Sequence, residues 1–360
     1  MDRVLTSMEL NAGYVTGRKI DADRHRWAQP GVEELGGGVF RIPLPLGSNG
    51  LRAVNVYALV DDSGVDLIDG GDALVEAREQ LEAGFRAIGC GLGDVRNIFV
   101  THYHKDHYTL AVELRRSWGT VVQLGEEERA NLQASRDIIS GKRESNLPGV
   151  LRRAGGSEII ESLDSDPSQQ DATQWEDPDH WIADGTDLAV RSRSLRAIHT
   201  PGHTRGHLIF RDAEHQVLFA GDHVLPHITP SIGYEPADNR MALRDYLNSL
   251  QLLLSLPDTR LFPAHGPVCD STHRRVRELL EHHDVRLAAA IAAVRGGAAT
   301  GYESAQVLRW TRHERRFDEL VPMDQYLACA ETAAHLEVLA VRGDLVRQTT
   351  AEGVDVYTVA

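Results

Sequence analysis

The sequence is short of cysteine and of long apolar runs. Its 360 residues include three cysteines, Cys90, Cys269 and Cys329, which are too few and too scattered for a disulfide framework and are typical of a reducing compartment. No apolar run approaches the roughly 20 residues that cross a bilayer. The first residues, MDRVLTSMELNAGY, lack the basic start and apolar stretch of a secretory signal. These absences predict a cytoplasmic protein with no membrane partner.

Positive charge is also scarce. Lys and Arg together number 38 against 53 Asp and Glu, which gives a formal net charge of −15. Residues 155–189 hold ten acids and neither Lys nor Arg. Such a surface repels phosphate backbones, so we do not expect nucleic acid as a partner. The hydrophobic share of 42% and the charged share of 25% are those of an ordinary globular protein, and the length predicts two domains or one large domain with an appendage.

Two common catalytic motifs are missing from the sequence. It contains no GxSxG, the turn that presents a nucleophilic serine, and no GxxxxGK[ST], the loop that cradles phosphates. The chemistry must therefore come from other residues.

Short apolar runs bounded by turn residues predict strands. They lie at 54–60, 65–68, 98–100 and 119–123, and again near 188 and at 195–198, 207–211 and 216–220. Between Ala73 and Ile88 the apolar residues recur every three or four positions, which predicts a helix. Strands that alternate with helices predict a layered α/β fold.

Residues 125–187 interrupt this pattern with polar, mostly helical segments. Two interpretations are open. The stretch is either a solvated surface insertion or a cap over a pocket, to which Trp175 and Trp181 would offer apolar contact. In both cases its acids would repel a polyanion.

The C-terminal region, residues 271–360, is helical and rich in arginine. We expect helices at 274–295, 303–314 and 324–341, followed by a hairpin that turns at 352–353. Three helices and a hairpin are the order of a winged-helix unit. The region has 11 Arg, no Lys and 13 acids, which is not the strongly basic signature of a DNA-reading module. Packing or homodimerisation is the expected role.

The densest histidine cluster of the chain is THYHKDH. It follows the apolar run 97–100, so His102, His104, Asp106 and His107 lie where a strand ends and the chain turns. The turn lets all four side chains converge, because an extended strand would send alternate side chains to opposite faces. Imidazole and carboxylate are ligands that suit zinc and related divalent ions.

Three more polar clusters each follow an apolar run. They are HTPGHTRGH, with His203 and His207; GDH, with Asp222 and His223; and PAHG, with His265. Strand ends that gather along one edge of a layered sheet would bring these residues into one multi-ligand site. Either His203 or His207 could supply the imidazole of its cluster.

Together, HxHxDH, TPGHTxGH, a GD after a strand and a late His-Gly resemble the metallo-β-lactamase superfamily over about residues 38–270. The resemblance implies a four-layer αββα catalytic domain at 1–270, with the acidic segment 125–187 inserted into it. The C-terminal domain at 271–360 resembles the winged-helix extension of a subset of these hydrolases.

The resemblance also implies two divalent metal ions, zinc in the first place, with iron or manganese as alternatives. The seven implied ligands form two groups and a bridge: His102, His104 and His203 for one ion, Asp106, His107 and His265 for the other, and Asp222 between them. Asp106 and Asp222 would also be the catalytic carboxylates.

Other residues would support these ligands. Asp69, in LIDGG, matches the family acid that orients a ligand imidazole near the first metal. His223 adjoins Asp222 and is expected behind the ligands or near substrate. The motif favours His203 over His207, which is then expected close behind the ligands.

Two ions that share a water would lower its pKa from 15.7 toward about 7 and supply hydroxide at neutral pH. Hydroxide could attack an acyl carbon or phosphorus. The bridging Asp222 resembles glyoxalase II, acyl-homoserine lactonases and the nucleases of the superfamily, whereas true metallo-β-lactamases generally place Cys or Ser there. We therefore expect a hydrolase that acts on a small acyl substrate, a thioester or a lactone.

Three alternatives are open. The first is a phosphodiesterase or nuclease of the same superfamily, which would use the C-terminal region to hold nucleic acid. The second is a persulfide-type dioxygenase with one iron, because such members use a similar ligand set. The third is a metal-binding scaffold without catalysis.

Overall fold

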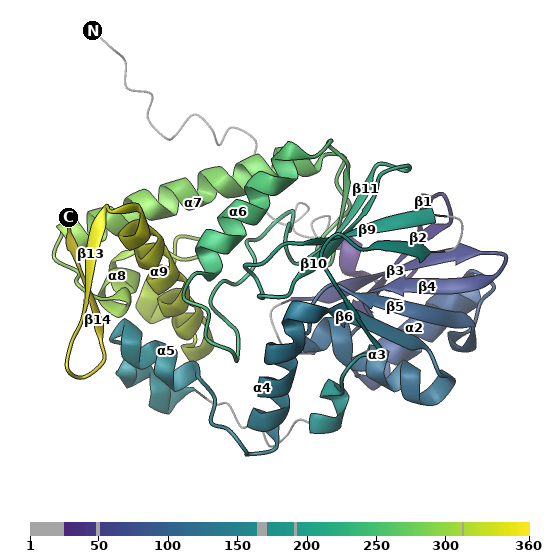
Figure 1. Cartoon of the computed structure of the whole chain (residues 1–360), viewed down its shortest axis with the longest axis horizontal. Coiled ribbons are helices and arrows are strands. Elements are labelled where there is room, and N and C mark those ends of the chain that lie inside the picture. Colours follow the sequence, from purple (N-terminus) through teal and green to yellow (C-terminus); the bar gives the residue numbers. More distant parts are fainter. Residues whose placement is uncertain (1–24, 48–50, 164–170, 191–192, 312) are drawn as a thin grey trace, which may run out of the picture.

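The computed structural model describes residues 25–47, 51–163, 171–190, 193–311 and 313–360. The first residues, on which the expectation of no secretory signal rests, lie outside these ranges. Two β-sheets pack face to face at one end of the molecule, and helices lie outside both sheets (Figure 1). The C-terminal helices and a final hairpin occupy the other end.

The first sheet has seven strands in sequence order. Its first four strands are antiparallel, and the fourth to the seventh are parallel. The third strand is buried along most of its length, which explains its nearly continuous apolar run. The strands are β1 (Glu33–Gly36), β2 (Val39–Pro45), β3 (Ala53–Asp61), β4 (Gly64–Ile68), β5 (Val95–Val100), β6 (Val121–Gly125) and β7 (His180–Ile182).

The second sheet has five strands in the order β12-β11-β10-β9-β8. Its strands are antiparallel except for the pair β11 and β12, which is parallel. They are β8 (Asp187–Val190), β9 (Arg193–His199), β10 (Leu208–Asp212), β11 (Val217–Gly221) and β12 (Arg260–Pro263).

Aromatic side chains fill the space between the two sheets. Tyr57 of the first sheet stacks on Phe262 of the second with ring centroids 5.4 Å apart, and Phe99 meets Phe210 edge to face at 6.2 Å. Packing of both inner faces against each other keeps the strand ends of the two sheets in one place.

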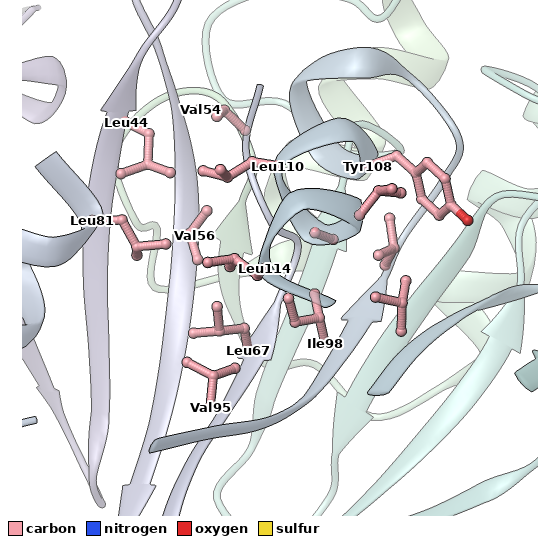
Figure 2. Close-up of a cluster of buried hydrophobic side chains, with 14 of the residues drawn as sticks. Leu44, Val54, Val56, Leu67, Leu81, Val95, Ile98, Tyr108, Leu110 and Leu114 are labelled. Carbon is pink, nitrogen blue, oxygen red and sulfur yellow. The ribbon is translucent and has the colours of Figure 1, made fainter. Parts of the chain in front are cut away.

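Two helices, α2 (Val75–Ala87) and α3 (Lys105–Trp118), cover the outer face of the first sheet. Figure 2 shows their apolar residues directed at the strands, with Leu81 of α2 and Leu114 of α3 near Val56 and Leu67. The predicted helix at 73–88 corresponds to α2.

The outer face of the second sheet is covered by α6 (Ala242–Ser255) and α7 (Thr272–Arg295). A single apolar cluster joins Leu218 and Leu261 of the sheet to Leu250 of α6 and Leu279 of α7. Helices therefore flank two stacked sheets, and the expectation of a four-layer α/β fold is confirmed.

The C-terminal region continues with α8 (Gly301–Val307), α9 (Pro322–Arg342) and the hairpin β13 (Leu345–Thr349) and β14 (Asp355–Val359). The hairpin about 352–353 is confirmed. The helix predicted at 303–314 is wrong beyond Val307, because the chain turns there and Trp310 pairs with Arg315. The likeness to a winged helix and the boundary at residue 270 stay predictions.

The segment that interrupts the sheets contains α4 (Arg129–Ile139) and α5 (Leu147–Ala154) with short 3₁₀ turns around them. Its acids dock it onto α3: Glu176 pairs with Arg115 at 2.5 Å and with Arg116 at 2.5 Å. α5 packs against α9. The segment is thus bound to both ends of the molecule. Within the described ranges no helix is long and apolar enough to cross a membrane.

Candidate metal centre

The four polar clusters of the sequence meet at the strand ends of the two packed sheets. THYHKDH follows β5 of the first sheet. HTPGHTRGH joins β9 to β10, GDH begins at the end of β11, and PAHG follows β12, all in the second sheet. The packing of the sheets therefore brings together side chains that are up to 163 positions apart in the chain.

The first group of candidate ligands consists of three imidazoles. His104 Nδ1 lies 3.0 Å from His102 Nε2 and 3.0 Å from His203 Nε2. The three nitrogens lie within 4.8 Å of one another. Three converging imidazole nitrogens with room for a further ligand are the donor set of catalytic zinc sites.

The second group combines one carboxylate with two imidazoles. Asp106 Oδ2 lies 3.4 Å from His265 Nε2 and 3.7 Å from His107 Nε2. These three atoms also lie within 4.8 Å of one another.

Asp222 stands between the two groups. Its Oδ2 lies 3.5 Å from His203 Nε2, in the first group. Its Oδ1 lies 3.4 Å from His265 Nε2 and 3.7 Å from His107 Nε2, in the second. One carboxylate oxygen thus faces each group.

Backbone carbonyls orient two of the imidazoles. His203 Nδ1 donates to the Ser231 carbonyl at 2.9 Å, and His265 Nδ1 donates to the Ala53 carbonyl at 2.7 Å. A carbonyl only accepts, so the proton of each neutral ring lies on Nδ1 and the lone pair lies on Nε2. These lone pairs face the ligand groups.

Asp69 and Thr101 orient two further imidazoles, those of His107 and His102. Asp69 Oδ2 accepts a hydrogen bond from His107 Nδ1 at 2.9 Å. Thr101 Oγ1 donates to Asp69 Oδ1 at 2.9 Å and lies 3.0 Å from His102 Nδ1. We expected Asp69 beside the first group. The structure instead places it directly on His107 of the second group, and it reaches His102 only through Thr101.

His207 and His223 lie behind the ligands. His207 Nδ1 lies 3.1 Å from Thr200 Oγ1, and His207 Nε2 accepts from the backbone N–H of Asp222 at 3.2 Å. Both nitrogens of His207 are therefore engaged, whereas His203 points at His104. His223 is fully buried against Tyr246, with ring centroids 5.2 Å apart. This burial agrees with a position behind Asp222, and a position near substrate stays a prediction.

The loop that carries His265 is held by strand β3. Asn55 Nδ2 donates to the carbonyls of Pro263 at 2.9 Å and Gly266 at 2.8 Å, on both sides of the histidine. Many members of the family that the sequence resembles have glycine at the position of Ala264. Ala264 is buried in the core under the first sheet. The methyl group is thus accommodated without moving His265 away from its group.

Burial and nearby charges give the imidazoles of the two groups different pKa values. Burial lowers the pKa values of His102, His104 and His203 below their usual range, so these rings are neutral donors. Burial also acts on His107, but the carboxylates of Asp69 and Asp106 outweigh it and raise its pKa to about 10. The second group therefore favours positive charge among its carboxylates.

Several ligand atoms fit a metal ion because nothing in the protein satisfies them. His107 Nε2, His265 Nε2 and Asp222 Oδ1 are buried and have no hydrogen-bond partner among the described residues. A buried polar atom without a partner costs roughly 1–3 kcal/mol. Coordination of a divalent cation would satisfy all three at once.

The opening of the site lies on the side of His104 and Asp106, which are partly exposed while the other five candidate ligands are buried. Two aromatic residues border His104: the Tyr103 ring lies 4.8 Å and the Tyr234 ring 6.2 Å from it, centroid to centroid. Trp175 packs against Tyr103 at 6.2 Å. The inserted segment therefore contributes to the wall of this opening.

Sequence reasoning named Asp69 among the residues that support the ligands, but it missed Thr101 and the two backbone carbonyls. Thr101 directly precedes the first motif, and its position there could have been a signal. The carbonyls of Ser231 and Ala53 have no sequence signal, because every residue carries a carbonyl group.

Comparisons with known proteins agree with this geometry. Residues 49–265 match the family model of the metallo-β-lactamase superfamily. The chain belongs to this superfamily. It is 28% identical over 255 residues to a β-lactamase-like protein 2 homolog of Caenorhabditis elegans, covering 70% of this chain and 69% of the relative. A metallo-β-lactamase family protein of Thermus thermophilus has 28% identity and a TM-score of 0.72, over 91% of this chain and 100% of that one.

One relative of the superfamily carries an activity in its name. An atrochrysone carboxyl ACP thioesterase of Aspergillus fumigatus is 30% identical over 131 residues, which is 36% of each protein. The chain spans about a third of the length of several other fungal relatives, 36% and 30% in two cases. As a member of the metallo-β-lactamase superfamily, the protein is a hydrolase enzyme.

Proposed function

We propose that this protein hydrolyses an acyl bond, a thioester or a lactone of a small molecule, with two divalent ions, zinc in the first place, held by its seven candidate ligands. The observation that carries the proposal is the position of Asp222. Its two oxygens lie 3.5 Å from His203 Nε2 and 3.4 Å from His265 Nε2, so they face different groups. A carboxylate in this position suits a pair of ions.

When bound, two such ions would acidify a shared water and polarise the oxygen of the attacked carbonyl group. The chain's own residues hold and orient the candidate ligands. The carbonyls of Ser231 and Ala53 keep the protons of His203 and His265 on Nδ1, so that Nε2 is free to coordinate. Asp69 does the same for His107. Tyr103 is buried and packs against the His104 ring.

Two further observations support an acyl substrate. The thioesterase of Aspergillus fumigatus is a relative that cleaves an acyl bond by name. The acids of residues 155–189, a stretch without Lys or Arg, would repel a long polyanion. A phosphodiester substrate is the alternative that the test must separate.

The test is an activity panel with the metal content measured on the same sample. The panel comprises S-lactoylglutathione, an acyl-CoA, a homoserine lactone, a phosphodiester and a penicillin. We expect hydrolysis of a thioester or the lactone and two zinc ions per chain. Cleavage of the phosphodiester alone would support the nuclease alternative. One iron per chain in place of two zinc ions would support the dioxygenase.

Substitution of the bridge tests the site itself. We expect Asp222→Ala and His102→Ala to reduce turnover to the background rate, because each removes a ligand atom that no neighbour can replace. Circular dichroism should show an intact fold in both variants. His180→Ala, a substitution of an exposed histidine in β7, is the matched control and should keep full activity. Retained turnover in either ligand variant would contradict the proposal.

A further inference from the structure

Two glutamates are buried directly behind the turn that carries His203. Glu128 is fully buried, although its neighbours Glu126 and Glu127 are exposed. Glu235 is 5% exposed. Glutamate is almost never fully buried unless it is paired, so these two side chains need partners.

Asn131 of α4 joins the two carboxyl groups. Its Nδ2 donates to Glu128 Oε2 at 2.9 Å and to Glu235 Oε2 at 2.7 Å. Burial raises the pKa of Glu128, the hydrogen bond from Thr204 lowers it, and the neighbouring Glu235 raises it again, to about 8. Burial also raises the pKa of Glu235. Glu128 is thus mostly protonated at neutral pH, which removes the repulsion between the two acids.

The two acids hold the residues that directly follow His203 in the turn. Thr204 Oγ1 donates to Glu128 Oε1, and the backbone N–H of Arg205 donates to Glu235 Oε2 at 2.9 Å. Gly206 packs so closely that a Cβ there would lie 2.2 Å from the backbone nitrogen of Glu128. The residues on the C-terminal side of the ligand are therefore fixed against the inserted segment.

One of the two acids also lies in the loop that orients the His203 ring. Glu235 belongs to the loop whose Ser231 carbonyl accepts the His203 Nδ1 proton at 2.9 Å. Tyr234, next to Glu235, borders the opening of the site. The ligand turn and the loop with the carbonyl that orients the ligand are thus joined at one buried cluster.

We propose that Glu128 and Glu235, joined by Asn131, are positioning residues for the first group of ligands. They hold the His203 turn so that His203 Nε2 remains 3.0 Å from His104 Nδ1. The inference rests on the ligand assignment of the proposed function. It does not depend on which substrate is cleaved.

The test measures zinc affinity, without a substrate. The full-length protein is stripped of metal and titrated with zinc against a chromophoric chelator. We expect Glu128→Ala to weaken one of the two zinc sites by about 10- to 100-fold, the usual effect of removing a group that supports a ligand. Glu128→Gln should restore most of this affinity, because glutamine keeps the length of the side chain and one oxygen that accepts a hydrogen bond.

Two controls separate positioning from loss of stability. Glu127→Ala removes an exposed acid beside Glu128 and should bind zinc as the unmodified chain does. Leu81→Ala creates a cavity under the first sheet and should lower the melting temperature without weakening zinc binding. Equal weakening by Leu81→Ala would overturn the proposal, because the effect would then be general destabilisation.

The remaining outcomes are also decisive. A folded Glu128→Ala variant that binds both zinc ions with unchanged affinity would overturn the proposal. If this variant does not fold, Thr204→Val removes the hydroxyl that donates to Glu128 and tests the same contact: weakened zinc binding supports the proposal, and unchanged binding overturns it. A chain that binds two zinc ions normally and hydrolyses no acyl substrate refutes the proposed function alone.

Discussion

Asp69 has a backbone conformation that residues with a side chain rarely adopt, with φ of 63°. Its carboxylate accepts from the backbone N–H of Thr101 at 2.8 Å as well as from Thr101 Oγ1 and His107 Nδ1. A strained residue that anchors two segments of a site is expected to be held there by its hydrogen bonds.

Removal of this carboxylate should therefore loosen the ligands. We expect Asp69→Ala to reduce metal affinity or kcat by about 10- to 100-fold, since His107 loses the acceptor that sets its tautomer. Metal content after dialysis and steady-state kinetics would measure the effect. Asp66→Ala, three positions earlier in the chain and on β4, is the comparison. Equal losses in both variants would show that the effect is not specific to the ligand.

The sequence motifs suggested the seven candidate ligands and one residue that supports them, Asp69, but not Thr101, Glu128 or Glu235. The seven candidate ligands lie in short motifs, and their types already indicate a metal. Glu128 lies in a run of three glutamates whose other members are exposed, so composition could not distinguish it. Burial depends on the contact with Thr204, which is 76 positions away.

Among the secondary-structure elements, helix α7 holds the loop that follows Asp222. Arg275 Nε donates to the Leu225 carbonyl at 2.6 Å, and Arg275 Nη2 donates to the Ile228 carbonyl at 3.1 Å. The same loop carries Ser231 and Tyr234 on its way to α6. The C-terminal region thus helps to shape the wall of the site.

We expect Arg275→Ala to lower the free energy of unfolding by about 1.5–3 kcal/mol, the usual worth of hydrogen bonds to a charged group, and to lower kcat/KM. Arg275→Lys should not restore both effects, because one ammonium group lacks the planar fork that reaches two carbonyls. Denaturant unfolding and kinetics would measure them. Arg274→Ala, its exposed neighbour, should behave as the unmodified chain.

The elements show where periodicity is informative. Periodic apolar residues predicted α2, the strands β3 to β6 and the strands β8 to β11 within a few residues, whereas β1, β2, β7 and β12 were not predicted. The helix at 303–314 was predicted too long. Trp310 continues the apolar pattern, yet its Nε1 donates to the Ala305 carbonyl at 2.9 Å from a tight turn, and Thr311 and Glu314 have positive φ. Tertiary contacts of this kind override a local pattern.

At the scale of the whole molecule, the C-terminal region shares its core with the second sheet. Leu279 of α7 and Leu336 of α9 belong to the same apolar cluster as Leu218 and Leu250. We expect a chain that ends at residue 270 to expose this cluster, bind a hydrophobic dye and aggregate. A soluble fragment with a cooperative unfolding transition would show instead that residues 1–270 fold independently.

Two buried histidines predict how stability depends on pH. Burial, helped by neighbouring His335 and Arg286, lowers the pKa of His283 to about 2, and burial lowers that of His335 to about 3. Both rings have pKa values near 6.5 in the unfolded chain, so the unfolded state binds more protons below that pH. Stability is therefore complete above about pH 6.5 and falls by about 1.4 kcal/mol per pH unit for each ring as the pH decreases.

Denaturant unfolding between pH 7 and pH 5 would measure this dependence. His283→Asn should make the slope shallower by about one proton, and substitution of the exposed His180 should leave it unchanged. Identical slopes for His283→Asn and the unmodified chain would contradict the prediction.

The two ligand groups draw their members from both sheets. His102, His104, Asp106 and His107 follow a strand of one sheet, whereas His203, Asp222 and His265 follow strands of the other. Neither half of the sandwich alone offers a full coordination sphere. A bound ion would cross-link the two sheets. Removal of the ion by a chelator should therefore make the sheets separate more readily. A folding intermediate with only one sheet formed should be unable to retain its metal.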